Sequence, residues 1–382
     1  MNQKKLPKIL ITMGDAAGIG PEISVKAALD AKIRRKCLPI IIGDINQLHE
    51  IVTQMINDTS FSSCHPELVS GSNSLSFELP RKKMLKQVQH DMVFFDLCKN
   101  TNKNYKLRIN VLDEKLGGSD ALYDGNIVNV IDVKFKPEYK VKAGLPDKVT
   151  GKYSFLYLEK ALDLIKNSFA EKLVTAPISK KAWQDAGILY PAHTEALAGM
   201  TNTKKYSMIF ANRKVKVVLA TRHIPVKDIS ENFDKKSLED ALDIGIQFLD
   251  MIGVEKKRIG VCGLNPHAGE DGCNGDEEIK IISPVLNQAR YKNIKFYGPV
   301  SGDAVFHKAM TGELDLVVAA YHDQGIFPLK AMDYFGCVNI TIGLPFIRVS
   351  PGHGTAFDIA GKNLANPDAM IEAILWSLKL KI

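Results

Sequence analysis

The sequence predicts an α/β fold of two domains built on a mostly parallel sheet. Runs of β-branched residues, each followed by a glycine-rich or polar turn and then a helical pattern, repeat along the chain. At 382 residues, of which 45% are hydrophobic and 24% charged, the chain has a globular composition and enough length for two lobes. We therefore expect an α/β/α arrangement with a ligand cleft between the domains.

The predicted strands are short apolar runs that end in a turn. In chain order they are KILITMG at 8–14, PIIIGD at 39–44, KLVTAP at 172–177, VKVVLAT at 215–221, RIGVCGL at 258–264 and LDLVVAAY at 314–321. Apolar residues at a period near 3.6 predict helices at 21–31, 153–168, 236–252 and 277–291. We expect residues 1–185 plus 340–382 to form the first domain and residues 186–339 to form the second.

The segment 59–91 departs from this pattern. It has mixed periodicity and many small polar residues, and it ends in the lysine-rich RKKMLKQVQH. We expect a surface insertion in the first domain, where His65 and His90 face solvent and take no part in chemistry.

Charge, hydropathy and cysteine content exclude several classes of protein. The net charge of +7 comes from dispersed Lys and Arg rather than a basic arm, so we expect no nucleic-acid binding. No window approaches the roughly 20 apolar residues of a membrane helix, and the N-terminal residues carry no export signal. The six cysteines are scattered without a CxxC pair, which suits free thiols in a reducing, cytoplasmic location.

The histidines are the most informative residues. Five of them lie in turns that follow or closely trail a predicted strand: His193, His223, His267, His322 and His353. In open α/β sheets that edge forms the ligand crevice. Three imidazoles converging from separate loops would suit zinc, cobalt or a similar divalent ion, although any one of them alone could simply cap a loop.

Two glycine-rich segments suggest anion binding, each with a plain structural alternative. Gly14, Gly18 and Gly20 lie between a strand and a helix, where they could receive an anion or form only a tight turn before Pro21. Residues 339–367 are interpreted as a long loop after a strand, which could wrap a nucleotide or be an ordinary connection. Arg348 in the apolar LPFIRVS run calls for an anionic partner, and Lys330 and Asn339 could share it.

With these residues in view, the chain strongly resembles the 4-hydroxythreonine-4-phosphate dehydrogenase family of vitamin B6 biosynthesis. The resemblance runs from Pro7 to the C-terminus except for about 59–106. Nine motifs appear in family order: GDAAGIGPE, TAPISKKAW, HTEALA, ATRHIP, CGLNPHAGEDG, GDEEI, YHDQG, NITIGLPFIR and HGTAFDIAG. The family shares the fold of isocitrate and isopropylmalate dehydrogenases, which is not a Rossmann domain, in agreement with the missing GxGxxG.

The resemblance implies a role for each candidate residue. One divalent metal (Zn, Co or Mg) is expected at His223, His267 and His322, in a site between the subunits of a homodimer, both of which supply ligands. The substrate residues are expected to be His193, Thr194, Lys330, Asn339 and Arg348. The loop that looks like an adenine-binding loop is expected to hold NAD or NADP through His353, Asp358 and Asn366. The general base is not assigned.

The implied reaction is the oxidation of 4-hydroxythreonine 4-phosphate to a β-keto acid that then loses carbon dioxide. Departures from the family pattern lie at Ala16, Ala192, Pro351 and Gly352, and the missing acid at Gly352 leaves the preference between NAD and NADP open. Related phosphorylated hydroxy acids such as phosphoerythronate or phosphothreonate remain alternative substrates. A non-redox metallohydrolase and a binding protein that has lost turnover are rival readings from other classes.

Overall fold

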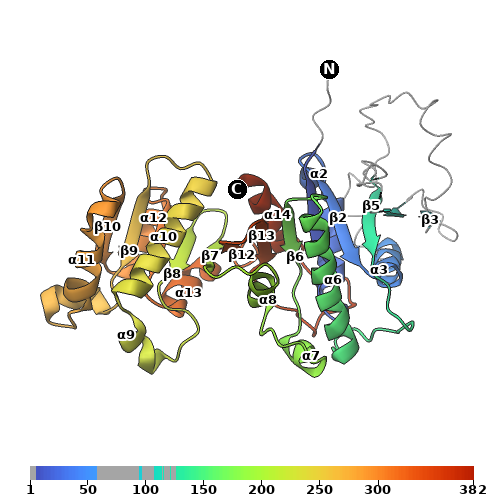
Figure 1. Cartoon of the computed structure of the whole chain (residues 1–382), viewed down its shortest axis with the longest axis horizontal. Coiled ribbons are helices and arrows are strands. Elements are labelled where there is room, and N and C mark those ends of the chain that lie inside the picture. Colours follow the sequence, from blue (N-terminus) through green and yellow to red (C-terminus); the bar gives the residue numbers. More distant parts are fainter. Residues whose placement is uncertain (1–5, 58–93, 97–106, 114, 116–120, 122–125) are drawn as a thin grey trace, which may run out of the picture. The chain divides into compact units, whose positions relative to one another are not determined.

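The computed structural model describes residues 6–57, 94–96, 107–113, 115, 121 and 126–382 (Figure 1). The chain divides into two compact units, Met1–His193 with His353–Ile374, and Thr194–Gly352 with Leu375–Ile382. Residues 340–352 belong to the second unit, together with the middle of the chain. The domain limits expected from the sequence stay a prediction. The predicted insertion at 59–91, with His65 and His90, lies outside the described residues.

The first unit is built on a sheet whose strands lie in the order β6-β1-β2-β5-β4-β3. All neighbours run parallel except β3 and β4. The strands are β1 Lys8–Thr12, β2 Leu38–Gly43, β3 Phe94–Asp96, β4 Arg108–Val111, β5 Ile127–Asp132 and β6 Lys172–Thr175. Its helices are α1 Gly20–Leu29, α2 Ala31–Arg34, α3 Ile45–Asn57, α6 Lys148–Lys166 and α7 Lys180–Asp185. β2 is buried throughout, as expected for a strand covered on both faces.

The second unit has the strand order β10-β9-β11-β8-β7-β12-β13, parallel from β10 to β8 and antiparallel from β8 to β13. The strands are β7 Ser207–Ala211, β8 Lys216–Leu219, β9 Arg258–Cys262, β10 Lys295–Val300, β11 Leu316–Ala319, β12 Val338–Ile342 and β13 Ile347–Pro351. The helices are α8 His193–Met200, α9 Ile229–Asn232, α10 Lys235–Met251, α11 Ser283–Leu286, α12 Gly302–Met310 and α13 His322–Met332. The chain ends in α14, Asp368–Lys379.

Helices cover both faces of the parallel strands in the second unit. A Cβ on Gly245 of α10 would lie 2.4 Å from Leu316, whereas a Cβ on Gly325 of α13 would lie 2.6 Å from Leu219. Successive strand residues point to opposite faces, and Val217 joins Leu219 against Gly325 while Val218 faces Gly245. Each glycine therefore allows a helix to approach its own face of the sheet closely.

Most of the predicted elements are confirmed, with one correction among the helices. Each of the six predicted strand runs contains a strand, and helices occupy 20–29, 148–166 and 235–251. The predicted helix at 277–291 is wrong as a continuous element. It consists of a π-helical turn, Glu278–Ile282, then α11 and a 3₁₀ turn, Ala289–Tyr291. Helical backbone continues through Pro284 to Leu286, and the helix ends where Gln288, with a ψ of 140°, is extended.

No helix in the described part of the chain is long and apolar enough to cross a membrane. Four cysteines fall within the described residues, and all four are free thiols: Cys37, Cys262, Cys273 and Cys337.

A buried ion pair fastens α1 to the loop that precedes α14. Lys26 Nζ lies 2.6 Å from Glu22 Oε1 and also donates to the carbonyl oxygens of Asn363 and Ala365. We expect Lys26→Met to lower the free energy of unfolding by about 3 kcal/mol, because Glu22 would be left as a buried charge without its cation. Urea denaturation measures this, and Lys236→Met, which breaks an exposed pair on α10, is the control. Equal stability of the two variants would contradict the prediction.

Candidate functional site

Three of the predicted histidines follow parallel strands that lie side by side in the second unit. His223 follows β8, His267 follows β9 and His322 follows β11. Because these strands are parallel neighbours, their carboxyl ends meet at one edge of the sheet. The Gln324 side chain joins two of these ends, since it accepts from Ala320 N at 2.7 Å and donates to the Gly263 carbonyl at 2.8 Å.

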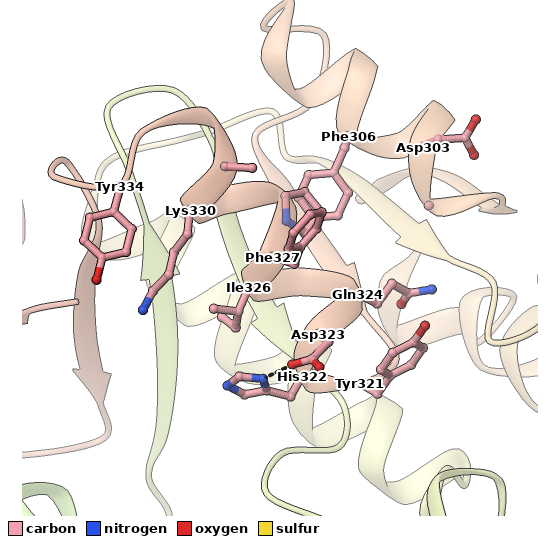
Figure 2. Close-up of a pocket in the computed structure, with 13 residues that line it drawn as sticks. Asp303, Phe306, Tyr321, His322, Asp323, Gln324, Ile326, Phe327, Lys330 and Tyr334 are labelled. Atoms are coloured by element: carbon pink, nitrogen blue, oxygen red, sulfur yellow. Dashed lines mark hydrogen bonds and ion pairs between the residues drawn. The ribbon is translucent and has the colours of Figure 1, made fainter. Parts of the chain in front are cut away.

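His223 and His322 form a pair of imidazoles. Their ring centroids lie 5.6 Å apart, with the ring planes tilted by 42°. His322 Nδ1 lies 2.7 Å from Asp323 Oδ1, a contact drawn in Figure 2. The carboxylate favours a proton on Nδ1, so Nε2 is the ring nitrogen suited to accept a metal.

His267 lies in an unusual backbone turn. Five consecutive residues, His267–Asp271, have φ between 43° and 80°, in the left-handed region. Four of them carry side chains, and for such residues this conformation costs about 1 kcal/mol or more each. The His267 side chain is 76% exposed, and its Nδ1 lies 2.9 Å from Glu270 Oε1. The Glu270 carboxylate raises the pKa of His267 and again leaves Nε2 facing outward.

Within the described ranges, no three His, Cys, Asp or Glu side chains are close enough to hold a metal together. One chain therefore brings His223 and His322 together but does not add His267 to them. The residue types still fit a divalent ion of the zinc or cobalt kind. Two of the imidazoles have a carboxylate on Nδ1, which is the arrangement that metal-binding histidines ordinarily show.

A pocket of about 990 Å³ opens beside His322. Figure 2 shows His322, Ile326 and Lys330 projecting from α13, at a spacing that places them on one face of the helix. Asp303 and Tyr334 also line the pocket, and Lys330 Nζ lies 5.6 Å from the Tyr334 ring centroid. The pocket thus combines an imidazole, an ammonium group and carboxylates with apolar walls.

Arg348 is the centre of a second group of predicted substrate residues. Its Nη1 lies 3.0 Å from Thr341 Oγ1 and 3.3 Å from Thr194 Oγ1, and the residue is 3% exposed. Burial lowers the pKa of Arg348 to about 10, and the charge of Glu195 opposes this shift. Asn339 Nδ2 lies 3.1 Å from the Met208 sulfur, which is also in contact with Thr194.

The expectation of a long loop around Arg348 is wrong. Arg348 lies on β13, where it pairs with Thr341 of the antiparallel neighbour β12. Gly343, with a φ of 101°, permits the turn between the two strands. The hairpin aims the guanidinium at Thr194 on α8.

His193 does not trail a strand as expected. It is the first residue of α8, eighteen positions after the end of β6 at Thr175. Its ring packs edge-on against Trp183, with centroids 5.4 Å apart, and the residue is 8% exposed. Trp183 therefore fixes the orientation of the imidazole.

The predicted nucleotide residues lie along one loop of the first unit. His353 Nδ1 is 3.0 Å from the Gly354 carbonyl, the Asp358 carbonyl accepts from Lys362, and Asn366 caps α14 through Asp368 N. A Cβ on Gly354 would meet nothing within 4 Å, so the loop faces open space there. At Gly352 a Cβ would lie 2.8 Å from the Cys337 carbonyl, and local packing thus disfavours the acid that the family usually has.

The turn after β1 contains a buried carboxylate. Asp15 is 0% exposed, and its Oδ1 accepts from Ala17 N at 2.9 Å. Burial raises the pKa of Asp15 above its ordinary value of 3.8. Gly14 has a φ of 70°, and a Cβ there would clash with Pro177 O. The glycine-rich segment after β1 therefore forms a tight turn, which was the structural alternative to an anion site.

We expect Asp15→Asn to stabilise the protein at neutral pH. A raised pKa means that the folded state binds the proton more tightly, so the free energy of unfolding falls as pH rises above 3.8 towards the folded pKa. Asparagine keeps the contact with Ala17 and loses this dependence. Urea denaturation at pH 3 and pH 7 should give equal stabilities at pH 3 and a more stable variant at pH 7. Lower stability of the variant at pH 7 would contradict this assignment.

Sequence reasoning missed four residues that contact the predicted site residues. Glu270 and Asp323 orient His267 and His322, while Thr341 and Met208 contact the predicted substrate residues. The signal for the two acids was present in HAGED and YHDQG, since each acid lies within three residues of its histidine. Met208 and Thr341 gave no such signal, because strand pairing brings them near Arg348 and Asn339.

Comparison with known proteins agrees with this fold. Residues 35–377 match the family described as "Pyridoxal phosphate biosynthetic protein PdxA". D-threonate 4-phosphate dehydrogenase from Pectobacterium atrosepticum is 32% identical over 97% of this chain and 98% of its own length. The enzyme of that name from Cupriavidus necator is 35% identical over 98% and 97%. The crystal structure of 4-hydroxythreonine-4-phosphate dehydrogenase from Klebsiella pneumoniae is 30% identical, covers 100% of both chains and has a TM-score of 0.77.

The fold and these relatives place the chain in the class of dehydrogenases that act on a phosphorylated hydroxy acid. The chain belongs to the PdxA family.

Proposed function

We propose that this protein catalyses the NAD- or NADP-dependent oxidation of 4-hydroxythreonine 4-phosphate to 2-amino-3-oxo-4-phosphooxybutanoate. That β-keto acid then loses carbon dioxide to give 3-amino-2-oxopropyl phosphate, a step of pyridoxal phosphate biosynthesis. A cytoplasmic location, suggested by the scattered cysteines, is part of the proposal.

The observation that carries the proposal is the composition of the pocket on α13. His322, oriented by Asp323, shares one face of the helix with the cation of Lys330. An imidazole beside an ammonium group suits a substrate that has both an oxidisable hydroxyl and a phosphate. Asp303 also lines this pocket.

The chain's own residues would bind and orient the substrate. Lys330, Asn339 and Arg348 would hold its anionic groups, and Thr194, already in contact with Arg348, would fix its position. Such positioning contributes about 7 kcal/mol or more in favourable cases. The buried guanidinium has little water around it, so its attraction to an anion is weakly screened.

The proposed metal residues are His223, His267 and His322, and the proposed nucleotide residues are His353, Asp358 and Asn366. When bound, a divalent metal would act as a Lewis acid towards the substrate hydroxyl, and the nicotinamide would accept the hydride. Asp323 and Glu270 hold the imidazoles in the tautomer that presents Nε2.

A homodimer with the active site at the subunit interface is part of the same proposal. His223 and His322 of one chain would then be completed by His267 of a second copy. The support is that the described part of one chain does not gather all three imidazoles.

D-threonate 4-phosphate is the second candidate substrate. It carries a hydroxyl where 4-hydroxythreonine 4-phosphate carries an amino group. The two relatives from Pectobacterium atrosepticum and Cupriavidus necator are named as D-threonate 4-phosphate dehydrogenases. The shared phosphate and neighbouring hydroxyl would use the same cationic residues. The two substrates differ only in this amino or hydroxyl group.

A substrate panel tests the proposal. Purified protein with Zn²⁺, Co²⁺ or Mg²⁺ and either NAD or NADP is mixed with 4-hydroxythreonine 4-phosphate, D-threonate 4-phosphate or phosphoerythronate. We expect reduced nicotinamide to appear fastest with the first substrate. Faster reduction with D-threonate 4-phosphate would transfer the assignment to that acid. Release of inorganic phosphate without nicotinamide reduction would indicate the metallohydrolase instead.

A further inference from the structure

The left-handed turn that carries His267 needs strong local support. His267, Ala268, Glu270 and Asp271 all adopt positive φ values that side chains disfavour. A strained segment of this kind persists only when surrounding contacts hold it in place. Groups packed against the turn must therefore supply those contacts.

Glu278 is the principal support. It is 3% exposed and begins the π-helical turn Glu278–Ile282. Its Oε1 accepts the backbone N–H of Asn265 at 2.9 Å, and its Oε2 accepts Asn265 Nδ2 at 3.0 Å. One carboxylate thus binds both the main chain and the side chain of the residue two positions before His267.

The same carboxylate also lies directly against the turn. A Cβ on Gly263 would be 2.9 Å from Glu278 Oε1, and a Cβ on Gly269 would be 2.8 Å from Oε2. Glu278 is therefore packed between the residue that follows β9 and the middle of the turn. Neither glycine can be replaced without displacing this carboxylate.

Asn265 connects the support to the turn. Its carbonyl accepts from Ala268 N at 3.1 Å, inside the left-handed segment. Its Nδ2 also donates to Glu277 Oε2 at 2.7 Å, while Glu277 Oε1 accepts from Ser230 Oγ at 2.6 Å. Asn265 is thus held by two adjacent carboxylates, one buried and one half-buried.

From these contacts we infer that Glu278 is a positioning residue, whose carboxylate holds the backbone of His267 through Asn265 in the conformation required for metal binding. The inference rests on the proposed function in taking His267 as a metal ligand. Glu278 itself touches neither metal nor substrate in this scheme.

The test compares Glu278→Ala and Glu278→Gln with a matched control in the same unit. Asp315→Asn is that control, because Asp315 makes two bonds to the Arg258 guanidinium at the opposite, amino ends of β9 and β11. Two quantities are measured on each full-length variant. They are the amide hydrogen exchange of residues 263–275 without metal, and the affinity for Zn²⁺ and Co²⁺ by titration calorimetry.

In Glu278→Ala we expect exchange in the turn to accelerate at least tenfold and metal affinity to fall by about 10- to 100-fold. Glu278→Gln keeps one acceptor for Asn265 N, and we expect smaller changes of the same sign. Asp315→Asn should match wild type in both quantities. If Glu278→Ala does not fold, the same comparison is made with Glu278→Gln.

Unchanged metal affinity in a folded Glu278 variant whose turn exchanges faster would overturn the inference, because the carboxylate would then be only structural. Unchanged exchange would overturn it as well. Failure of the wild-type chain to bind Zn²⁺ or Co²⁺ would instead defeat the proposed function, and the exchange measurement would still decide whether Glu278 holds the turn.

Discussion

Replacing Arg348 by methionine is expected to lower kcat/KM by roughly 30- to 5,000-fold, the equivalent of about 2–5 kcal/mol for removing one member of a buried charge pair. Arg348 is 3% exposed and bonds to Thr194 and Thr341, so no solvent-exposed lysine can take its place on the substrate. The loss should appear mainly in KM if the guanidinium binds the ground state and the transition state equally well.

The same variant should remain folded, because methionine fills similar volume. Some stability should be lost, because Glu195, whose charge opposes the lowered pKa of Arg348, would lose a nearby cation. Steady-state kinetics and thermal denaturation provide the two measurements. Arg258→Met is the control, since it removes a guanidinium at the amino end of β9 and should leave kcat/KM unchanged. Wild-type kinetics in Arg348→Met would remove this residue from the substrate site.

Replacing His267 by alanine is expected to abolish measurable turnover, a loss of roughly 10³-fold or more, and to lower the bound metal content. The fold should be intact because the side chain is 76% exposed and its partner, Glu270, lies in the same turn. Metal analysis of the purified protein, circular dichroism and the nicotinamide assay measure the three effects.

His307→Ala is the matched control for this experiment. His307 is exposed on α12 in the same unit, so its loss should change neither turnover nor metal content. Full activity in His267→Ala would refute the site assignment. Lost activity with full metal content would retain His267 as a functional residue but remove it from the metal site.

The parallel part of the fold follows from local patterns in the sequence. β8, β9 and β11 are mostly apolar runs, and β8 and β9 each begin with one basic residue. Polar turns follow all three strands, and this pattern places His223, His267 and His322 at strand ends without any knowledge of pairing. The parallel order of these strands then puts the three histidines on one edge. The general location of the candidate site was therefore predictable.

Its detailed geometry was not predictable, because it depends on contacts between distant residues. Arg348 was expected in a loop, since nothing in LPFIRVS shows that β12 will pair with it. The backbone at His267 is left-handed because Glu278, eleven positions later, supports it through Asn265. In the same way, the predicted helix at 277–291 begins with a π-helical turn and ends before Gln288, whose backbone is extended.

Gln324 has a mechanical consequence for the site. One primary amide spans the gap between the ends of β9 and β11 and bonds to the backbone of both. The loop that leads to His267 and the helix that begins at His322 are thereby linked where they leave the sheet. Separating the two would break both hydrogen bonds of this amide, so the link favours their moving together.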